Sequence, residues 1–129
     1  MTGPTFSIAI EPPLIVVTLS GPFRLDDWLG VMRAMPDTPG FEPGLHTLVD
    51  GRQAHFDFMF DDAKRLNEVV SRHLDEKRGR GFRSAWVVGA DVDFGVARMV
   101  QTVLEDLPLE ARTFRSIDDA RRWLLEPRG

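Results

Sequence analysis

Three aspartates occupy positions from which carboxylates could perform chemistry. Asp50 directly follows the apolar run 45–49, and Asp91 and Asp93 follow the apolar run 85–90. Because open α/β sheets bind ligands at the carboxyl ends of their strands, these side chains could serve as a general acid and a general base. Such a pair requires surroundings that separate the two pKa values, and the neighbouring residues indicate none. An acid–base enzyme is therefore the third of three hypotheses.

Each carboxylate also has a structural role that would account for it. Asp93 can cap the helix that follows it, and Asp50 can be held in place by Arg52 or Arg98. Cysteine is absent. The three histidines are His46, His55 and His73, and no two of them have the i, i+4 spacing of a metal-binding pair on a helix. No P-loop, dinucleotide fingerprint or nucleophile elbow occurs. We expect no catalytic residue, no metal and no cofactor.

The segment 53–60 concentrates aromatic side chains. It is expected to be a loop, because the strand before it should stop at Asp50 and turn at Gly51. Rings alternate with other residues here, so an extended segment would present three of them on one side. The rings either pack onto the domain's own core or form a lid over an apolar pocket or a dimer contact. The residues concerned are Phe56, Phe58, Met59 and Phe60.

The first half of the chain predicts a hairpin followed by a helix and a strand. Residues 6–10 alternate apolar and small side chains and 14–19 are β-branched or apolar, which is typical of paired strands. Gly21 and Pro22 should break the second strand, and Asp26 should cap a helix that extends to about Met35. A turn-rich loop at 37–44 then leads into the strand 45–49.

The second half predicts three helices that alternate with two strands. Asp61 should cap a long helix that ends near Arg78, and 85–90 should be a strand buried on both faces. The helix after Asp93 is followed by an edge strand at 110–115, and Ser116 caps a last helix. The fold class is α/β, a single domain over 1–129 in the order β-β-α-β-α-β-α-β-α, with a mixed, mostly parallel sheet.

Composition excludes several classes of protein. The net charge is −4, with 43% hydrophobic and 28% charged residues, so the chain should fold into a globular domain and should not bind nucleic acid. The one basic run, Arg78, Arg80 and Arg83, is expected to be a solvated helix end. No stretch approaches about 18 apolar residues and no signal peptide is evident, so we expect a cytoplasmic protein without stable membrane insertion.

The order of these elements and several short motifs resemble the SpoIIAA-like proteins of the STAS/SEC14-type superfamily. The motifs are Leu48-Val49-Asp50 with Arg52 beyond it, the helix opening from Phe94 through Arg98 to Met99, and Phe114-Arg115 followed by Ala120 and Trp123-Leu124. The resemblance implies a non-enzymatic module. Anti-sigma-factor antagonists in this superfamily bind partner proteins and are switched by phosphorylation, and its lipid-transfer domains hold a hydrophobic ligand.

The chain departs from the antagonists at the site of that switch. The resemblance places a phosphorylatable hydroxyl at the start of the helix after the central strand, where free backbone N–H groups would meet the phosphate. Here no serine or threonine lies between Thr47 and Ser71. Asp61 and Asp62 could supply a permanent negative charge or could simply cap the helix.

Two functional hypotheses of different class therefore lead. The first is a STAS-like regulatory module without the phospho-acceptor serine, which docks a protein partner or forms a homodimer. The second is a carrier or sensor of a hydrophobic, lipid-like ligand held under a lid at 53–60. The candidate binding residues are Phe56, Phe58, Met59, Phe60, Asp61, Asp50, Arg52, Phe94 and Arg98.

Overall fold

Five strands form one mixed sheet whose order in space equals their order along the chain. The computed structural model describes residues 3–59, 61–79 and 81–127. Its elements are β1 Thr5–Glu11, β2 Leu14–Arg24, α1 Leu25–Ala34, the 3-10 turn η1 Met35–Asp37, β3 His46–Asp57, α2 Asp62–His73, the π-helical turn η2 Leu74–Arg78, β4 Arg83–Val88, α3 Asp91–Val103, β5 Glu110–Phe114 and α4 Ile117–Leu124. β1 is antiparallel to β2, and the remaining pairs are parallel. The predicted α/β class, element order and hairpin are confirmed.

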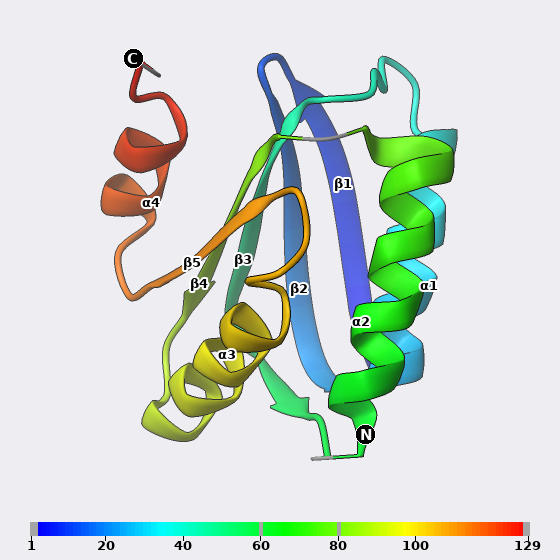
Figure 1. The fold of residues 1–129 in the computed structure, drawn as a ribbon. Coiled ribbons are helices and arrows are strands. Elements are labelled where there is room, and N and C mark those ends of the chain that lie inside the picture. The colour runs from blue at the N-terminus through cyan, green and yellow to red at the C-terminus, as the bar shows by residue number, and fades with distance from the viewer. Residues whose placement is uncertain (1–2, 60, 80, 128–129) are drawn as a thin grey trace.

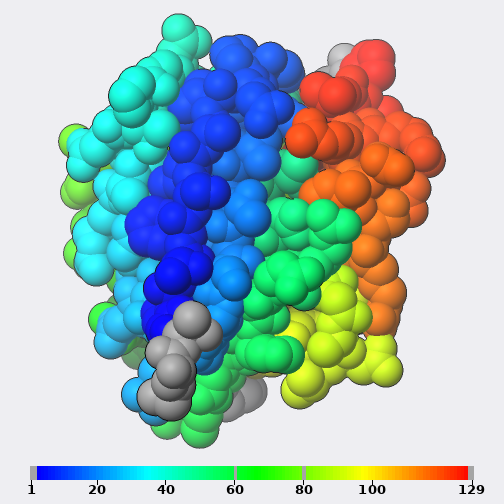
Figure 2. Space-filling view, turned by 180° about the vertical axis from the view of Figure 1, so that it is seen from behind, coloured from blue at the N-terminus to red at the C-terminus, as the bar shows by residue number. Residues whose placement is uncertain are grey.

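The sheet buries apolar side chains on both faces. The larger cluster joins β2, β3 and β4 to α1, α2 and α3 on one face, and the smaller cluster joins the same strands to α4 on the other (Figure 1). Every residue of β4 is buried, as predicted for the apolar run, but the strand begins at Arg83 and ends at Val88, so residues 89 and 90 of the predicted strand lie outside it and are exposed. On the second face β1, β2 and the end of β3 form part of the molecular surface beside α3 and α4 (Figure 2).

Two strands are longer than the sequence pattern predicts. β2 continues through Gly21 and Pro22 to Arg24, although both were expected to break it. Proline is tolerated because β1 pairs with β2 only as far as Ser20, so Pro22 lies beyond the hairpin, where its missing N–H costs no bond to β1. β3 likewise does not stop at Asp50 but continues to Asp57, so the predicted loop at 51–57 is wrong.

A β-bulge explains why β3 looks interrupted in the sequence. Thr18 pairs with Asp50 but Ser20 pairs with Gln53, so β3 contains one extra residue at this point. An extra residue reverses the alternation of side chains. The face that packs against α1, α2 and α3 is therefore lined by Val49 before the bulge and by Phe56 after it. Gly51 does not form a turn. Glycine is required at this position because the Cβ of any other residue would lie 2.9 Å from the Phe56 ring.

The predicted helix caps are mostly wrong, although the helices are present. Asp27, rather than Asp26, accepts the hydrogen bond from the Arg24 backbone N–H (2.9 Å). At the start of α2, Asp61 occupies the predicted N-cap position but its side chain makes no capping bond, and Asp62 instead accepts a hydrogen bond from the Met59 backbone N–H (2.7 Å). Asp93 lies inside the first turn of α3, whose N-cap is Ala90.

The cap at Ser116 is confirmed, because its hydroxyl oxygen accepts from the Asp119 backbone N–H (3.2 Å). α2 itself ends at His73, and the chain continues to Arg78 as a π-helical turn. Within the part of the chain that the structure describes, no helix has the length and apolar character needed to cross a membrane.

Candidate functional site

The carboxyl ends of β2, β3 and β4 and the first turns of α1, α2 and α3 lie at one edge of the sheet (Figure 1). The first turn of each of these helices carries aspartate. Two large apolar side chains are also exposed at this edge, Met59 at 64% and Val92 at 70%. The acidic rim is our name for five exposed residues, the last residue of β3 and four that follow β3 or β4: Asp57, Met59, Asp61, Asp91 and Val92.

Asp50 and Arg52 form an ion pair rather than a catalytic pair. The Arg52 guanidinium donates through Nε (2.9 Å) and Nη2 (2.8 Å) to the two oxygens of Asp50. The hydrogen bond from Arg52 lowers the pKa of the Asp50 carboxyl, so this group stays ionised at neutral pH. Arg98 is exposed on α3 and makes no ion pair among the described residues, so Arg52 alone holds Asp50.

Asp93 is a buried anchor between α3 and β3. Its side chain is 3% exposed; one oxygen accepts from the Phe56 backbone N–H (2.9 Å) and the other lies 3.1 Å from His55 Nδ1. β3 pairs with β4 only from Thr47 to Gly51, so Asp93 supplies an acceptor for a part of β3 that β4 does not reach. The position of this carboxylate is therefore explained by structure, and its predicted role as a helix cap is wrong.

The third strand-end carboxylate, Asp91, is exposed and forms an ion pair with Arg115 (2.7 Å). The same guanidinium lies 4.4 Å from the centre of the Phe94 ring, which it partly covers. Each of the three aspartates thus has its own partner, and the structure does not unite them in one acid–base site.

The aromatic segment belongs to the core. Phe56 and Phe58 are 5% and 8% exposed. The Phe56 ring centre lies 5.3 Å from that of Trp86 and 5.8 Å from that of Phe58. Residues 53–57 are paired with β2, so they cannot open as a lid, and that prediction is wrong. Met59 is the one predicted aromatic-segment residue that the structure exposes, and Phe60 lies outside the described residues.

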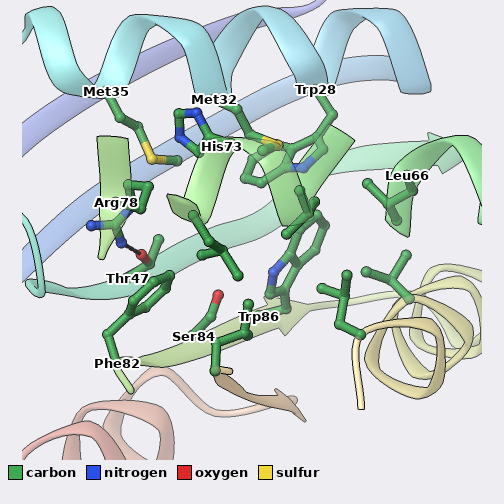
Figure 3. Close-up of a pocket in the computed structure, with 15 residues that line it drawn as sticks. Trp28, Met32, Met35, Thr47, Leu66, His73, Arg78, Phe82, Ser84 and Trp86 are labelled. Carbon is green, nitrogen blue, oxygen red and sulfur yellow. Dashed lines mark hydrogen bonds between the residues drawn. The ribbon is translucent and has the colours of Figure 1, made fainter. Parts of the chain in front are cut away.

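A small cavity between the sheet and the helices α1 and α2 was missed by the sequence patterns (Figure 3). Its volume is about 50 Å³. Most of its wall is apolar, with Trp28 and Met32 on α1 and Trp86 on β4, but Thr47, His73, Arg78 and Ser84 contribute polar atoms. A polar end and an apolar end therefore face the same partly open space.

The two described arginines of the basic run are buried, which overturns the prediction of a solvated helix end for them. Arg78 is 2% exposed and Arg83 is 9% exposed, while Arg80 lies outside the described residues. Arg83 Nη1 donates to the Trp123 carbonyl oxygen (2.6 Å), so this side chain supports the end of α4. A signal for Arg78 was present, because it continues the four-residue spacing of the buried residues Leu66, Val70 and Leu74.

Burial lowers the pKa of both basic side chains that line the cavity, Arg78 and His73. The pKa of Arg78 falls to about 10, so the guanidinium remains charged at neutral pH. The pKa of His73 falls to about 4, chiefly because burial disfavours the charged ring and secondarily because Arg78 and Lys77 repel it. The imidazole is therefore neutral at pH 7.

His73 should make the protein less stable as the pH is lowered. Between the unfolded pKa of 6.5 and the folded pKa of about 4, the unfolded state binds a proton that the folded state does not. The free energy of unfolding should therefore fall by about 2 kcal/mol through this window, after a discount for the partly exposed ring. Urea unfolding at pH 7 and pH 4.5 measures this loss. H73Q should lose this part of the pH dependence, and an unchanged dependence would contradict the assignment.

Comparison with known proteins supports the fold assignment. No protein-family model and no curated protein sequence matches the chain. Among solved structures, it is similar to an uncharacterised protein of the DUF3478 family with a SpoIIAA-like fold from Shewanella loihica (TM-score 0.59, 17% identity, 95% of this chain and 94% of that one). It is also similar to an anti-sigma factor antagonist from Mycobacterium paratuberculosis (TM-score 0.59, 13% identity, 96% of each chain). The resemblance drawn from the sequence is thus confirmed at the level of the fold, and the chain is a single α/β domain with the SpoIIAA-like fold.

Proposed function

We propose that the protein is a non-enzymatic STAS-like regulatory module that docks a basic protein partner on the acidic rim. The observation that carries this proposal is the exposure of Met59 and Val92 at the same sheet edge as exposed carboxylates. Among the described residues, neither Asp57 nor Asp61 has an ion-pair partner. Apolar anchors beside the unpaired carboxylates of Asp57 and Asp61 suit a partner with positive charge, although Asp91 of the rim is already paired with Arg115.

The similarity to an anti-sigma factor antagonist supports a function in protein docking. The family resemblance drawn from the sequence implies that the antagonists' phosphorylated hydroxyl lies at the start of the helix after the central strand, where this chain has Asp61 and Asp62. The Asp62 side chain accepts a hydrogen bond from the Met59 backbone N–H, but the exposed Asp61 side chain makes no capping bond. Asp61 is therefore free to offer a partner a permanent negative charge, which would not require phosphorylation.

The other two hypotheses fit the structure less well. A cavity of about 50 Å³ is far below the roughly 300–1,000 Å³ of pockets that hold drug-sized ligands, and the proposed lid is a paired strand. Catalysis by Asp50 or Asp93 would require breaking the hydrogen bonds that now hold Arg52 and Phe56. A homodimer through the rim would bring the same acidic residues together, because two-fold interfaces are self-complementary.

Photo-crosslinking from position 59 in cells should identify the partner, and titration of that purified partner tests the rim. M59S should weaken its affinity about 5- to 30-fold, as expected for a central apolar anchor. D61N should weaken it less and reduce its salt dependence, because a charge at the interface is removed. L125S, at an exposed apolar residue that caps the C-terminus of the far helix α4, is the matched control and should bind normally.

Equal affinity of wild-type protein and M59S for that partner would refute the proposal. A crosslink from residue 59 to a second copy of the chain, together with a dimer in sedimentation, would replace it with self-association. Hydrolysis or group transfer that D93N abolishes in a folded protein would instead establish the enzyme hypothesis.

A further inference from the structure

The cavity beside Arg78 contains a buried positive charge that lacks a counter-ion. Arg78 is 2% exposed, and its Nη2 donates to the Leu45 carbonyl oxygen (3.0 Å) and to Thr47 Oγ1 (2.6 Å). Both partners are neutral. Among the described residues no carboxylate pairs with this guanidinium, and its Nη1 is buried without a hydrogen-bond acceptor.

Burying such a group destabilises the folded protein unless something compensates its charge. The Phe82 ring, 4.1 Å from the guanidinium carbon, offsets part of the charge, but Nη1 still lacks a hydrogen-bond acceptor among the described residues. An anion bound in the adjoining cavity would supply both the acceptor and the missing negative charge.

A second unpartnered nitrogen faces the same cavity. His73 Nε2 is buried and has no hydrogen-bond partner among the described residues, and the ring lines the cavity with Arg78 (Figure 3). A neutral imidazole can donate one hydrogen bond, so His73 can assist Arg78 in binding an anion without adding charge. The π-helical turn η2, a conformation frequent at functional sites, carries Arg78 into this position.

The rest of the cavity determines the kind of anion. Trp28, Met32 and Trp86 make the opposite wall apolar, which disfavours an anion that is polar on every side. The volume of about 50 Å³ is several times the roughly 10–15 Å³ that one water needs by the same measure, which leaves room for only a few non-hydrogen atoms. A short carboxylate, with one charged end and one apolar end, matches both the size and the polarity.

We propose that this cavity is a binding site for a small monocarboxylate of the size of formate or acetate, with its carboxylate on Arg78 Nη1 and His73 Nε2 and its apolar end toward Trp28 and Trp86. The site is formed by the interior of the domain and does not involve the acidic rim. Its test is therefore independent of the docking function proposed above.

Thermal unfolding of the full chain in sodium acetate tests the site, with sodium gluconate used to hold the ionic strength constant. Gluconate is a carboxylate too large for the cavity. Acetate should raise the melting temperature in a saturable manner by about 3 °C or more. Carbon-13-labelled acetate should also show nuclear Overhauser contacts from its methyl group to the indole protons of Trp28 or Trp86.

Two variants and a control locate the effect. R78M removes the charge at similar length and should weaken acetate binding at least tenfold. S84I should also abolish binding, because it fills the cavity without touching Arg78, so the test survives if R78M does not fold. R112M replaces an exposed arginine on β5 and should leave the acetate response unchanged.

Several outcomes would overturn the proposal. An equal gain in melting temperature with chloride would assign the site to a halide, and an equal gain with gluconate would indicate a nonspecific salt effect. No saturable gain with acetate or formate would leave only water in the cavity. A response that R78M and S84I both retain would place any acetate elsewhere on the protein.

Discussion

Replacing Phe56 with alanine should lower the free energy of unfolding by about 3–5 kcal/mol, because it removes a ring from the centre of the aromatic cluster. Phe56 is 5% exposed, and its ring contacts those of Phe23, Phe58 and Trp86 at centre-to-centre distances of 6.3, 5.8 and 5.3 Å. The ring also fills the space that Gly51 leaves open. Little of this volume can be recovered by collapse, because the rings pack against two internal strands.

Urea unfolding of F56A and M59A compares a core residue with an exposed one three positions away. M59A should change the free energy of unfolding by less than about 0.5 kcal/mol, since Met59 is 64% exposed. F56L, which retains much of the apolar volume, should fall between the two. If F56A were as stable as the wild-type protein, the segment would be a detachable lid after all, and the packing described here would be wrong.

Replacing Asp93 with alanine should lower the free energy of unfolding by about 2–3 kcal/mol, because the Phe56 backbone N–H would lose its charged acceptor inside the protein. The contact joins residues 37 positions apart and fastens the first turn of α3 to the end of β3. D93N should cost less, because its amide oxygen can still accept this hydrogen bond. H55A should have little effect, because the His55 side chain is 76% exposed.

Amide hydrogen exchange distinguishes this anchor from a simple effect on the helix. In D93A the Phe56 amide should exchange much faster than in the wild-type protein. Amides in the middle of α3 should still exchange only through global unfolding of the variant. Loss of protection throughout α3 with an unchanged Phe56 amide would show that Asp93 serves the helix and not the strand.

The sequence predicted those features that depend on neighbours along the chain. The hairpin follows from alternation in 6–10 and 14–19, and the burial of β4 follows from its unbroken apolar run. The cap at Ser116 and the edge position of β5 depend on local residue types and were also predicted. The same reasoning failed at Gly51, where glycine and two polar residues are typical of a turn, because here the bulge brings the Phe56 ring of the same strand so close that only glycine fits.

The candidate sites depended on partners that sequence spacing cannot specify. Asp93 was expected to cap its own helix, but a backbone N–H on another strand came within 2.9 Å of it. Arg78 looked like a solvated helix end, although its four-residue spacing from Leu74 placed it on the buried row. Met59 and Phe58 are adjacent, yet one is exposed and the other is buried.

The sequence by itself therefore determined the element order, the hairpin and the fold class, because hydrophobic periodicity and turn chemistry act over a few residues. Only the tertiary structure decided that the aromatic segment is core, that Arg78 lines a partly open cavity and that Met59 remains on the surface. The physical reason is that burial and charge compensation are set by contacts between distant elements. A one-residue bulge in β3 was enough to exchange which side chains face the core and which face solvent.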